Sequence, residues 1–222
     1  MRGPLSGRTA IVTGAGYAIG AATSCALSDA GASVVLAARD GRALRSLAAD
    51  IGSAGGHAVA VPTDITNPVS VRRLVEQTLG AFGRLDAAFN HAQVLGVSLA
   101  MKYEIPAMRR HGGGRVVNLA RAAGTRAAVT ELTRAAALDF ADSGVRVNAV
   151  AAGPHDSAQD VAGAVVWLCS DGASLATGEI LCLRTTDLPH PLRHNRDRLS
   201  DSAWSDDRKP SFGGPDVKTA RR

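Results

Sequence analysis

The stretch that decides the fold is Thr9-Ala10-Ile11-Val12-Thr13-Gly14-Ala15-Gly16-Tyr17-Ala18-Ile19-Gly20. The apolar run at residues 9–12 predicts a strand, and the pattern over residues 18–30 predicts a helix that follows it. Between them, glycines let the chain turn sharply and bring backbone N–H groups together at a helix N-terminus. This strand–loop–helix context favours a phosphate-binding loop over a turn that uses glycine for steric reasons alone.

The same alternation of strand and helix continues along the chain. Short β-branched runs alternate with helix-length amphipathic stretches, which is typical of a parallel α/β sheet, and the strands lack polar alternation, so helices should cover both faces. The predicted strands are residues 9–12, 33–37, 57–61, 87–89, 115–119, 145–150 and 179–183. The predicted helices are residues 18–30, 41–53, 67–82, 94–111, 126–142 and 158–170. We therefore expect a Rossmann-like, doubly wound α/β sheet of about seven parallel strands. Asp40 should cap the second helix, and Pro106 should kink or shorten the fourth.

Composition indicates one folded domain with a tail. The 222 residues are 45% hydrophobic and 20% charged, which excludes a wholly disordered chain, a collagen-like repeat and a coiled coil. Residues 184–222 are polar, contain proline and show no periodicity, so we expect a disordered tail after a domain at 1–183.

Charge and hydropathy narrow the possible partners. The net charge is +5, but the tail holds nine Lys/Arg and six Asp/Glu, so the domain itself is nearly neutral and nucleic-acid binding is not expected. No apolar run approaches the roughly 18 residues of a membrane span, and no secretory signal is evident, which predicts a cytoplasmic protein without membrane contact. The cysteines, Cys25, Cys169 and Cys182, match no metal-ligand spacing and are expected to be buried, so no metal site is predicted.

The end of the second strand indicates which dinucleotide the loop would take. A dinucleotide fold reads the ribose at this position, where an acidic residue would bind a 2′-hydroxyl. This chain has Ala38, followed by Arg39, whose charge could neutralise a 2′-phosphate. The alternative makes Arg39 a solvated loop residue. We predict NADP(H) rather than NAD(H).

Several spaced motifs resemble those of the short-chain dehydrogenase/reductase family over residues 5–183. Asp64-Ile65 resembles the pair that flanks the adenine, and Asn90-His91-Ala92 resembles the Asn-Asn-Ala-Gly segment after the fourth strand. Asn118 lies in a run like the family's fifth strand, and Gly153 lies in a turn like the one after its sixth. Residues 160–178 resemble its last helix and the approach to the final strand.

The resemblance implies NAD(P)(H) lying across the carboxyl edge of the sheet, carbonyl reduction or alcohol oxidation on a small molecule, and a homodimer or homotetramer. The cofactor-binding residues predicted from the loop and the resemblance are Thr13, Gly14, Gly16, Tyr17, Ile19, Gly20, Arg39, Asp64, Ile65, Asn90, Ala92 and Gly153.

The chain departs from the family where the chemistry should lie. Family members use a serine, a tyrosine and a lysine, with the tyrosine donating the proton; here Arg121 stands in the place of the serine and Arg126 in that of the lysine. The only tyrosines are Tyr17, expected far from the nicotinamide, and Tyr103, expected to pack in a helix. Three segments look shortened: before Ala128, after Ala92, and after Pro154. Gln93 therefore aligns either with the glycine of the family's Asn-Asn-Ala-Gly segment or with its helical asparagine.

The catalytic residues stay unassigned, with His91, Arg126 and Arg121 as weak candidates. An imidazole can move a proton near neutral pH, whereas a guanidinium can only stabilise charge. Three hypotheses remain: an NADP(H)-dependent oxidoreductase with an altered active site; a catalytically silent nucleotide-binding protein or partner of an active paralogue; and a non-redox cyclase or isomerase. Family inheritance favours the first, and the chemistry of the site favours the second.

Overall fold

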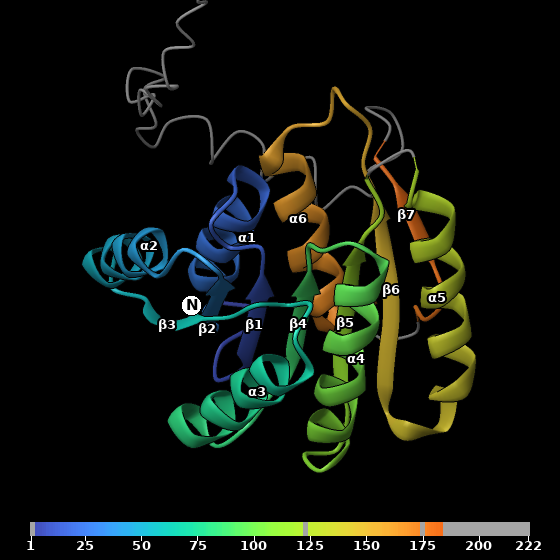
Figure 1. The fold of residues 1–222 in the computed structure, drawn as a ribbon, viewed down its shortest axis with the longest axis horizontal. Helices are drawn as coiled ribbons and strands as arrows, with labels where there is room; N and C mark the ends of the chain where they lie inside the picture. Colours follow the sequence, from blue (N-terminus) through green and yellow to red (C-terminus); the bar gives the residue numbers. More distant parts are fainter. Residues whose placement is uncertain (1–2, 122–123, 174–175, 184–222) are drawn as a thin grey trace, which may run out of the picture.

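The computed structural model describes residues 3–121, 124–173 and 176–183. Within them, seven parallel strands form one sheet in the order β3-β2-β1-β4-β5-β6-β7 (Figure 1). The strands are β1 Thr9–Thr13, β2 Ser33–Ala38, β3 His57–Pro62, β4 Ala87–Asn90, β5 Gly114–Leu119, β6 Val145–Ala151 and β7 Ile180–Cys182. The helices are α1 Ala18–Asp29, α2 Gly41–Ser53, α3 Pro68–Phe82, α4 Val94–Arg109, α5 Arg126–Asp139 and α6 Ala158–Cys169. The expected doubly wound sheet is confirmed.

Two apolar cores, one on each face, hold the sheet between its helices. Along β1, Ala10 and Val12 belong to the core under α1, α2 and α6, whereas Ile11 between them belongs to the core under α3, α4 and α5. Successive strand residues point to opposite faces, so an unbroken apolar run is needed where both faces are covered. The strand order reverses between β1 and β4. In open α/β folds the ligand crevice lies at such a switch point, at the carboxyl ends of the strands.

The helix boundaries differ little from the prediction. Asp40 caps α2 as expected, accepting hydrogen bonds from the N–H groups of Arg42 at 2.9 Å and Ala43 at 3.2 Å. Pro106 does not end α4, which continues to Arg109, and its ring is exposed. None of the described helices is long and apolar enough to cross a membrane.

Two expectations about burial are wrong. β3 is an edge strand, and its exposed residues, such as Val59, alternate with less exposed ones, because its outer face carries less cover than those of the central strands. Cys169 is buried, but Cys25 is half-buried and Cys182 is exposed at the other edge of the sheet. The predicted tail, residues 184–222, lies outside the described residues, so the division at residue 183 stays a prediction.

Candidate functional site

The ends of β1 and β4 are joined through a buried hydroxyl. The backbone N–H of His91 donates to Oγ1 of Thr13 at 3.0 Å, and that hydroxyl donates to the carbonyl of Phe89 at 3.4 Å. Thr13 is almost wholly buried, so this arrangement leaves none of these polar groups without a partner. The segment after β4 is thereby fixed against the start of the glycine-rich loop.

The glycines of the loop are needed for close backbone approach. Gly14 has a φ of 68°, in the left-handed region, and a Cβ there would lie 2.7 Å from the carbonyl oxygen of His91. A Cβ on Gly20 would overlap the backbone of Gly14, and one on Gly16 would touch Ala38. The loop is therefore pressed between α1 and the ends of β2 and β4, as a phosphate-binding turn requires.

The N-terminus of α1 faces this loop and has no side-chain cap. Tyr17 occupies the cap position in an extended conformation, but its side chain makes no capping hydrogen bond, and the first turn contains no acidic residue. Ile19 and Gly20 are buried in that first turn. The backbone N–H groups and the positive end of the helix dipole suit an anionic ligand.

A cation and an anion stand beyond the ends of β2 and β3. Arg39 is exposed directly after β2, and Asp64 is exposed after β3. The carboxylate of Asp64 accepts hydrogen bonds from the hydroxyl of Thr66 at 2.7 Å and from its N–H at 2.9 Å. These bonds, and more weakly the charge of Arg39, hold the pKa of Asp64 below its usual range. Ile65 packs near Gly96 at the start of α4.

His91, Tyr17 and Arg121 come together at the crevice. The rings of His91 and Tyr17 lie edge to face, with centroids 6.0 Å apart. Burial, and then the positive charge of Arg121, lower the pKa of His91, so the imidazole is neutral at pH 7. Its Nδ1 is buried and has no hydrogen-bond partner among the described residues.

Arg126, a candidate catalytic residue, and Gly153, a predicted cofactor-binding residue, lie in segments that follow β5 and β6. Arg126 is exposed at the first turn of α5. The N–H of Gly153 donates to Oδ2 of Asp156 at 2.6 Å, so this loop closes on itself. Among the described residues, no group of three or more His, Cys, Asp or Glu side chains could hold a metal ion.

A buried polar network lies beneath the crevice, and the sequence analysis missed it. Nδ2 of Asn90 donates to Oε2 of Glu104 at 3.0 Å and to Oδ1 of Asn118 at 3.2 Å. Nδ2 of Asn118 donates to the hydroxyl of Thr133 at 3.0 Å. The network joins β4, α4, β5 and α5, and all four side chains are buried. It therefore couples the ends of β4 and β5 to the two helices that cover them.

Glu104 is the ionisable residue of this network, and its pKa is shifted. Its side chain is 1% exposed, and burial raises its pKa to about 7 although the bond from Asn90 acts in the opposite direction. Its Oε1 has no partner among the described residues. Helical spacing could have revealed it, because Met101, Ile105 and Met108 predict that residue 104 falls on the buried face of α4.

The amino-acid sequence is similar to known family models and to known proteins. A family model described as short chain dehydrogenase matches residues 8–98, and one described as Enoyl-(Acyl carrier protein) reductase matches residues 91–159. The 2,5-dichloro-2,5-cyclohexadiene-1,4-diol dehydrogenase of Sphingobium indicum is 35% identical, over 80% of this chain and 95% of that enzyme. The chain belongs to the short-chain dehydrogenase/reductase family. The cyclohexanol dehydrogenase of an Acinetobacter species, another relative, is 30% identical over 80% of this chain and 94% of its own length.

Solved structures of this family share the fold. A hydroxysteroid dehydrogenase from Escherichia coli matches with a TM-score of 0.77 and 26% identity, over 81% of this chain and 95% of that one. A 7α-hydroxysteroid dehydrogenase in complex with NADH and 7-oxo glycochenodeoxycholic acid matches with a TM-score of 0.76 and 25% identity, over 81% and 93%. A short chain dehydrogenase from Mycobacterium smegmatis gives 0.78 and 28%, over 84% and 95%.

This family member is shorter than its relatives within the matched span. The alignment with the Sphingobium enzyme runs over 245 positions but includes 80% of 222 residues, which is about 178, so about 67 positions have no counterpart here. Internal segments are therefore missing, as the sequence analysis expects.

Proposed function

We propose that this chain binds NADP(H) across the carboxyl edge of its sheet and is nominally an oxidoreductase that acts on an alcohol or carbonyl group. The observation that carries the proposal is the loop after β1, where Gly14 adopts a positive φ and the first turn of α1 lacks a side-chain cap. An uncapped helix N-terminus behind a glycine turn is a ready anion site. No reaction step follows from binding alone, because a fold does not confer chemistry.

The residues at this edge fit a phosphorylated nicotinamide dinucleotide. The N–H groups of the first turn of α1, with Ile19 and Gly20, would hold the pyrophosphate, and Arg39 would pair with the 2′-phosphate. Asp64 and Ile65 would flank the adenine, and the backbone at Asn90 and Ala92 would line the ribose. Thr13 would keep the segment after β4 in place. When bound, the nicotinamide supplies or accepts a hydride.

Calorimetric titration with NADPH and NADH tests the choice of cofactor. We expect NADPH to bind more tightly, and Arg39→Ala to weaken NADPH binding about tenfold while leaving NADH binding nearly unchanged, because only NADPH carries the phosphate. Arg42→Ala is the control, since Arg42 lies in α2 within the same loop-to-helix region. Tighter binding of NADH than of NADPH by the wild type would contradict the proposed preference for NADPH. Both cofactors are titrated because the structure of the 7α-hydroxysteroid dehydrogenase, which is similar to this chain, contains NADH.

The names of the relatives narrow the substrate class. The Sphingobium and Acinetobacter enzymes are named for hydroxyl groups on six-membered carbon rings, as is the cis-4-hydroxycyclohexanecarboxylate dehydrogenase of Sinomonas cyclohexanicum, which is 31% identical. We infer that a secondary alcohol or ketone on such a ring is the substrate. NADP⁺ reduction with a panel of cyclohexanols, and NADPH oxidation with the matching ketones, test this inference. Turnover only with open-chain substrates would contradict it.

Proton delivery is altered in this proposal. Arg121 follows β5 where the family has its serine, and a guanidinium does not release a proton at pH 7. Tyr103 is half-buried in α4 beneath the ammonium group of Lys102, so it is a packing residue. Water, a ribose hydroxyl or His91 would have to supply the proton, and we expect turnover to be slow.

The second candidate is a catalytically silent nucleotide-binding protein or a partner of an active paralogue. It is favoured by the state of the imidazole at the end of β4: His91 is neutral and packed against Tyr17. Tight NADPH binding without turnover on the ring-alcohol panel would support this candidate. A non-redox cyclase or isomerase is the third, and product formation without cofactor would identify it.

We also propose that the protein is a homodimer or homotetramer in the cytoplasm. Leu138 in α5 is 79% exposed and Leu95 in α4 is 59% exposed, which gives these neighbouring helices apolar surface that a second copy could cover. Light scattering after gel filtration tests the assembly. We expect Leu138→Asp to shift it toward the monomer if α5 forms the interface, with Leu95→Asp as the matched change in α4.

A further inference from the structure

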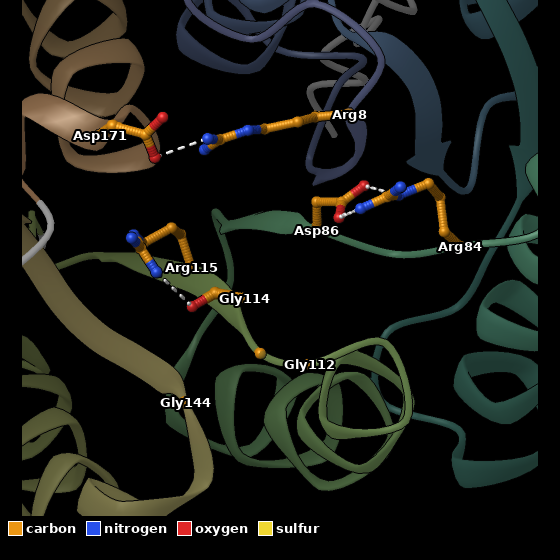
Figure 2. Close-up of a pocket in the computed structure, with 9 residues that line it drawn as sticks. Arg8, Arg84, Asp86, Gly112, Gly114, Arg115, Gly144 and Asp171 are labelled. Atoms are coloured by element: carbon orange, nitrogen blue, oxygen red, sulfur yellow. Dashed lines mark hydrogen bonds and ion pairs between the residues drawn. The ribbon is translucent and has the colours of Figure 1, made fainter.

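A polar cavity lies at the amino edge of the sheet, opposite the dinucleotide edge. It has a volume of about 180 Å³, several times the roughly 30 Å³ share of one water molecule. The residues before β1, β4 and β6, the first residues of β5, and the short helix at Asp171–Ala173 line it (Figure 2). None of the predicted dinucleotide-binding residues is among them, so it is a separate site.

The two carboxylates of the cavity already have partners. Asp86 accepts two hydrogen bonds from the guanidinium of Arg84, at 2.8 and 2.6 Å, and a third from the N–H of Thr9 at 2.8 Å. Asp171 accepts one from Arg8 at 2.6 Å, and Arg8 also donates to the carbonyl of Cys169. Figure 2 shows these two pairs on neighbouring sides of the cavity. Each acid is thus neutralised by an arginine of its own.

Arg115 is the third arginine of the cavity, and it is not paired with either carboxylate. It is half-buried at the start of β5, and its Nη1 donates a long hydrogen bond of 3.3 Å to the carbonyl of Gly114. Its Nε is buried without a partner, and within the described ranges Arg115 forms no ion pair. Burial, and then the charge of Arg8, lower the pKa of Arg115, whereas the charge of Asp171 acts in the opposite direction.

The wall beside Arg115 is made of backbone rather than side chains. Gly112 and Gly113 have φ values of 87° and 124°, and a Cβ on Gly113 would overlap the carbonyl of Gly144. The turns before β5 and β6 therefore approach closely and leave the space above them free of side chains. The lining holds three guanidinium groups and two carboxylates, which gives it a net charge of +1.

We propose that this cavity binds a small phosphate-type oxyanion, either inorganic phosphate or the phosphoryl group of a small metabolite, with Arg115 as its principal ligand. A guanidinium presents a planar set of donors that matches the oxygens of such an anion, and the charge of the anion would balance the surplus cation. Bound there, the anion bridges the starts of four strands and stabilises this edge of the sheet.

A titration followed on the arginine side chains tests the site directly. In a ¹⁵N-labelled wild-type protein, the Nε–H resonance of Arg115 is assigned as the one that Arg115→Gln lacks. We expect this resonance to shift and saturate as sodium phosphate is added, and to stay in place in sodium chloride of equal ionic strength. A shift that does not saturate, or one that chloride reproduces, would overturn the proposal.

Calorimetry with variants separates this site from the loop of α1, which also suits phosphate. We expect Arg115→Gln to weaken phosphate binding about tenfold. Arg134→Gln, which removes an exposed arginine paired with Glu131 on α5, should leave it unchanged. If Arg115→Gln binds phosphate as tightly as the wild type does, the anion binds at the α1 loop and the proposal is wrong. If Arg115→Gln does not fold, the resonance is assigned through Arg115→Lys and the titration of the wild type decides alone.

The two sources of the anion are distinguished by a phosphate ester. If inorganic phosphate binds more tightly than glycerol 3-phosphate, the ligand of the cavity is the free ion. If glycerol 3-phosphate binds more tightly, the ligand is a phosphorylated metabolite. Either order supports the site, provided that Arg115→Gln weakens both ligands. Failure of NADPH to bind would leave this result untouched, because the two edges share no ligand.

Discussion

Asn90, at the end of β4, donates a hydrogen bond from Nδ2 to Oε2 of Glu104 in α4 at 3.0 Å, and both side chains are buried from solvent. A single neutral donor does not replace the hydration that a carboxylate loses on burial, which is why the pKa of Glu104 rises to about 7. The chain thus holds a carboxyl group beneath its crevice that changes charge near neutral pH.

This relationship predicts that stability falls as the pH rises toward neutrality. Between about pH 4.5, the ordinary value, and about pH 7, Glu104 stays protonated in the folded protein but ionises in the unfolded chain. The unfolded state then binds fewer protons, so raising the pH favours unfolding, by up to about 3 kcal/mol. Glu104→Gln cannot ionise and should lose this slope in urea unfolding measured from pH 5 to pH 8.

The control for this prediction is Glu131→Gln, which changes an exposed glutamate of α5 paired with Arg134. It should keep the wild-type slope. Equal slopes in the wild type and in Glu104→Gln would show that Glu104 ionises normally.

A second prediction concerns the close approach of Gly20 to Gly14. A Cβ on Gly20 would overlap the Gly14 backbone, which cannot move as a flexible side chain would. Gly20→Ala should therefore cost about 2 kcal/mol in the free energy of unfolding and weaken NADPH binding as well. Gly80→Ala is the matched control, because nothing lies near its Cβ position on the exposed side of α3, and it should stabilise by about 0.5–1 kcal/mol. Equal effects of the two changes on unfolding would contradict the packing argument.

Most of the fold follows from local signals in the sequence. The unbroken apolar run of β1 and the amphipathic stretch of α1 reflect the two-sided burial that the structure shows, and Asp40 is recognisable as a cap from its position alone. These features depend on residues within one or two turns of each other. Local pattern predicts them for that reason.

The features that the sequence missed depend on contacts between distant residues. Arg8 and Asp171 form their ion pair across 163 positions, and Asn90 meets Asn118 across 28, so no local pattern shows either contact. The exposure of β3 follows from its place at the edge of the sheet, which the order of strands determines. His91 could be named as a candidate, but its lowered pKa depends on burial and then on the charge of Arg121.

A third prediction concerns the cap of α2, next to Arg39. The side chain of Asp40 accepts from two N–H groups of the first turn. Asp40→Ala leaves these donors without that partner and should cost about 1 kcal/mol in chemical unfolding. Asp40→Asn keeps an oxygen acceptor and should cost much less. A similar cost for both variants would mean that the negative charge at the helix N-terminus, and not the hydrogen bonds, is what stabilises α2.

The fourth prediction concerns His91 and has the opposite sign to that for Glu104. Burial and the charge of Arg121 lower the pKa of His91 below 6.5, so the unfolded chain takes up a proton more readily than the folded protein. Stability is therefore lost as the pH falls below about 6.5 and through the folded pKa. The midpoint of the His91 imidazole, followed by proton NMR and assigned through His91→Asn, should lie below the ordinary histidine value of about 6.5. Arg121→Ser removes the repelling charge and should raise the midpoint, though burial should still keep it low. A wild-type midpoint at or above about 6.5 would show that burial and Arg121 do not disfavour the charged imidazole, and would restore His91 as the acid for the proposed reduction.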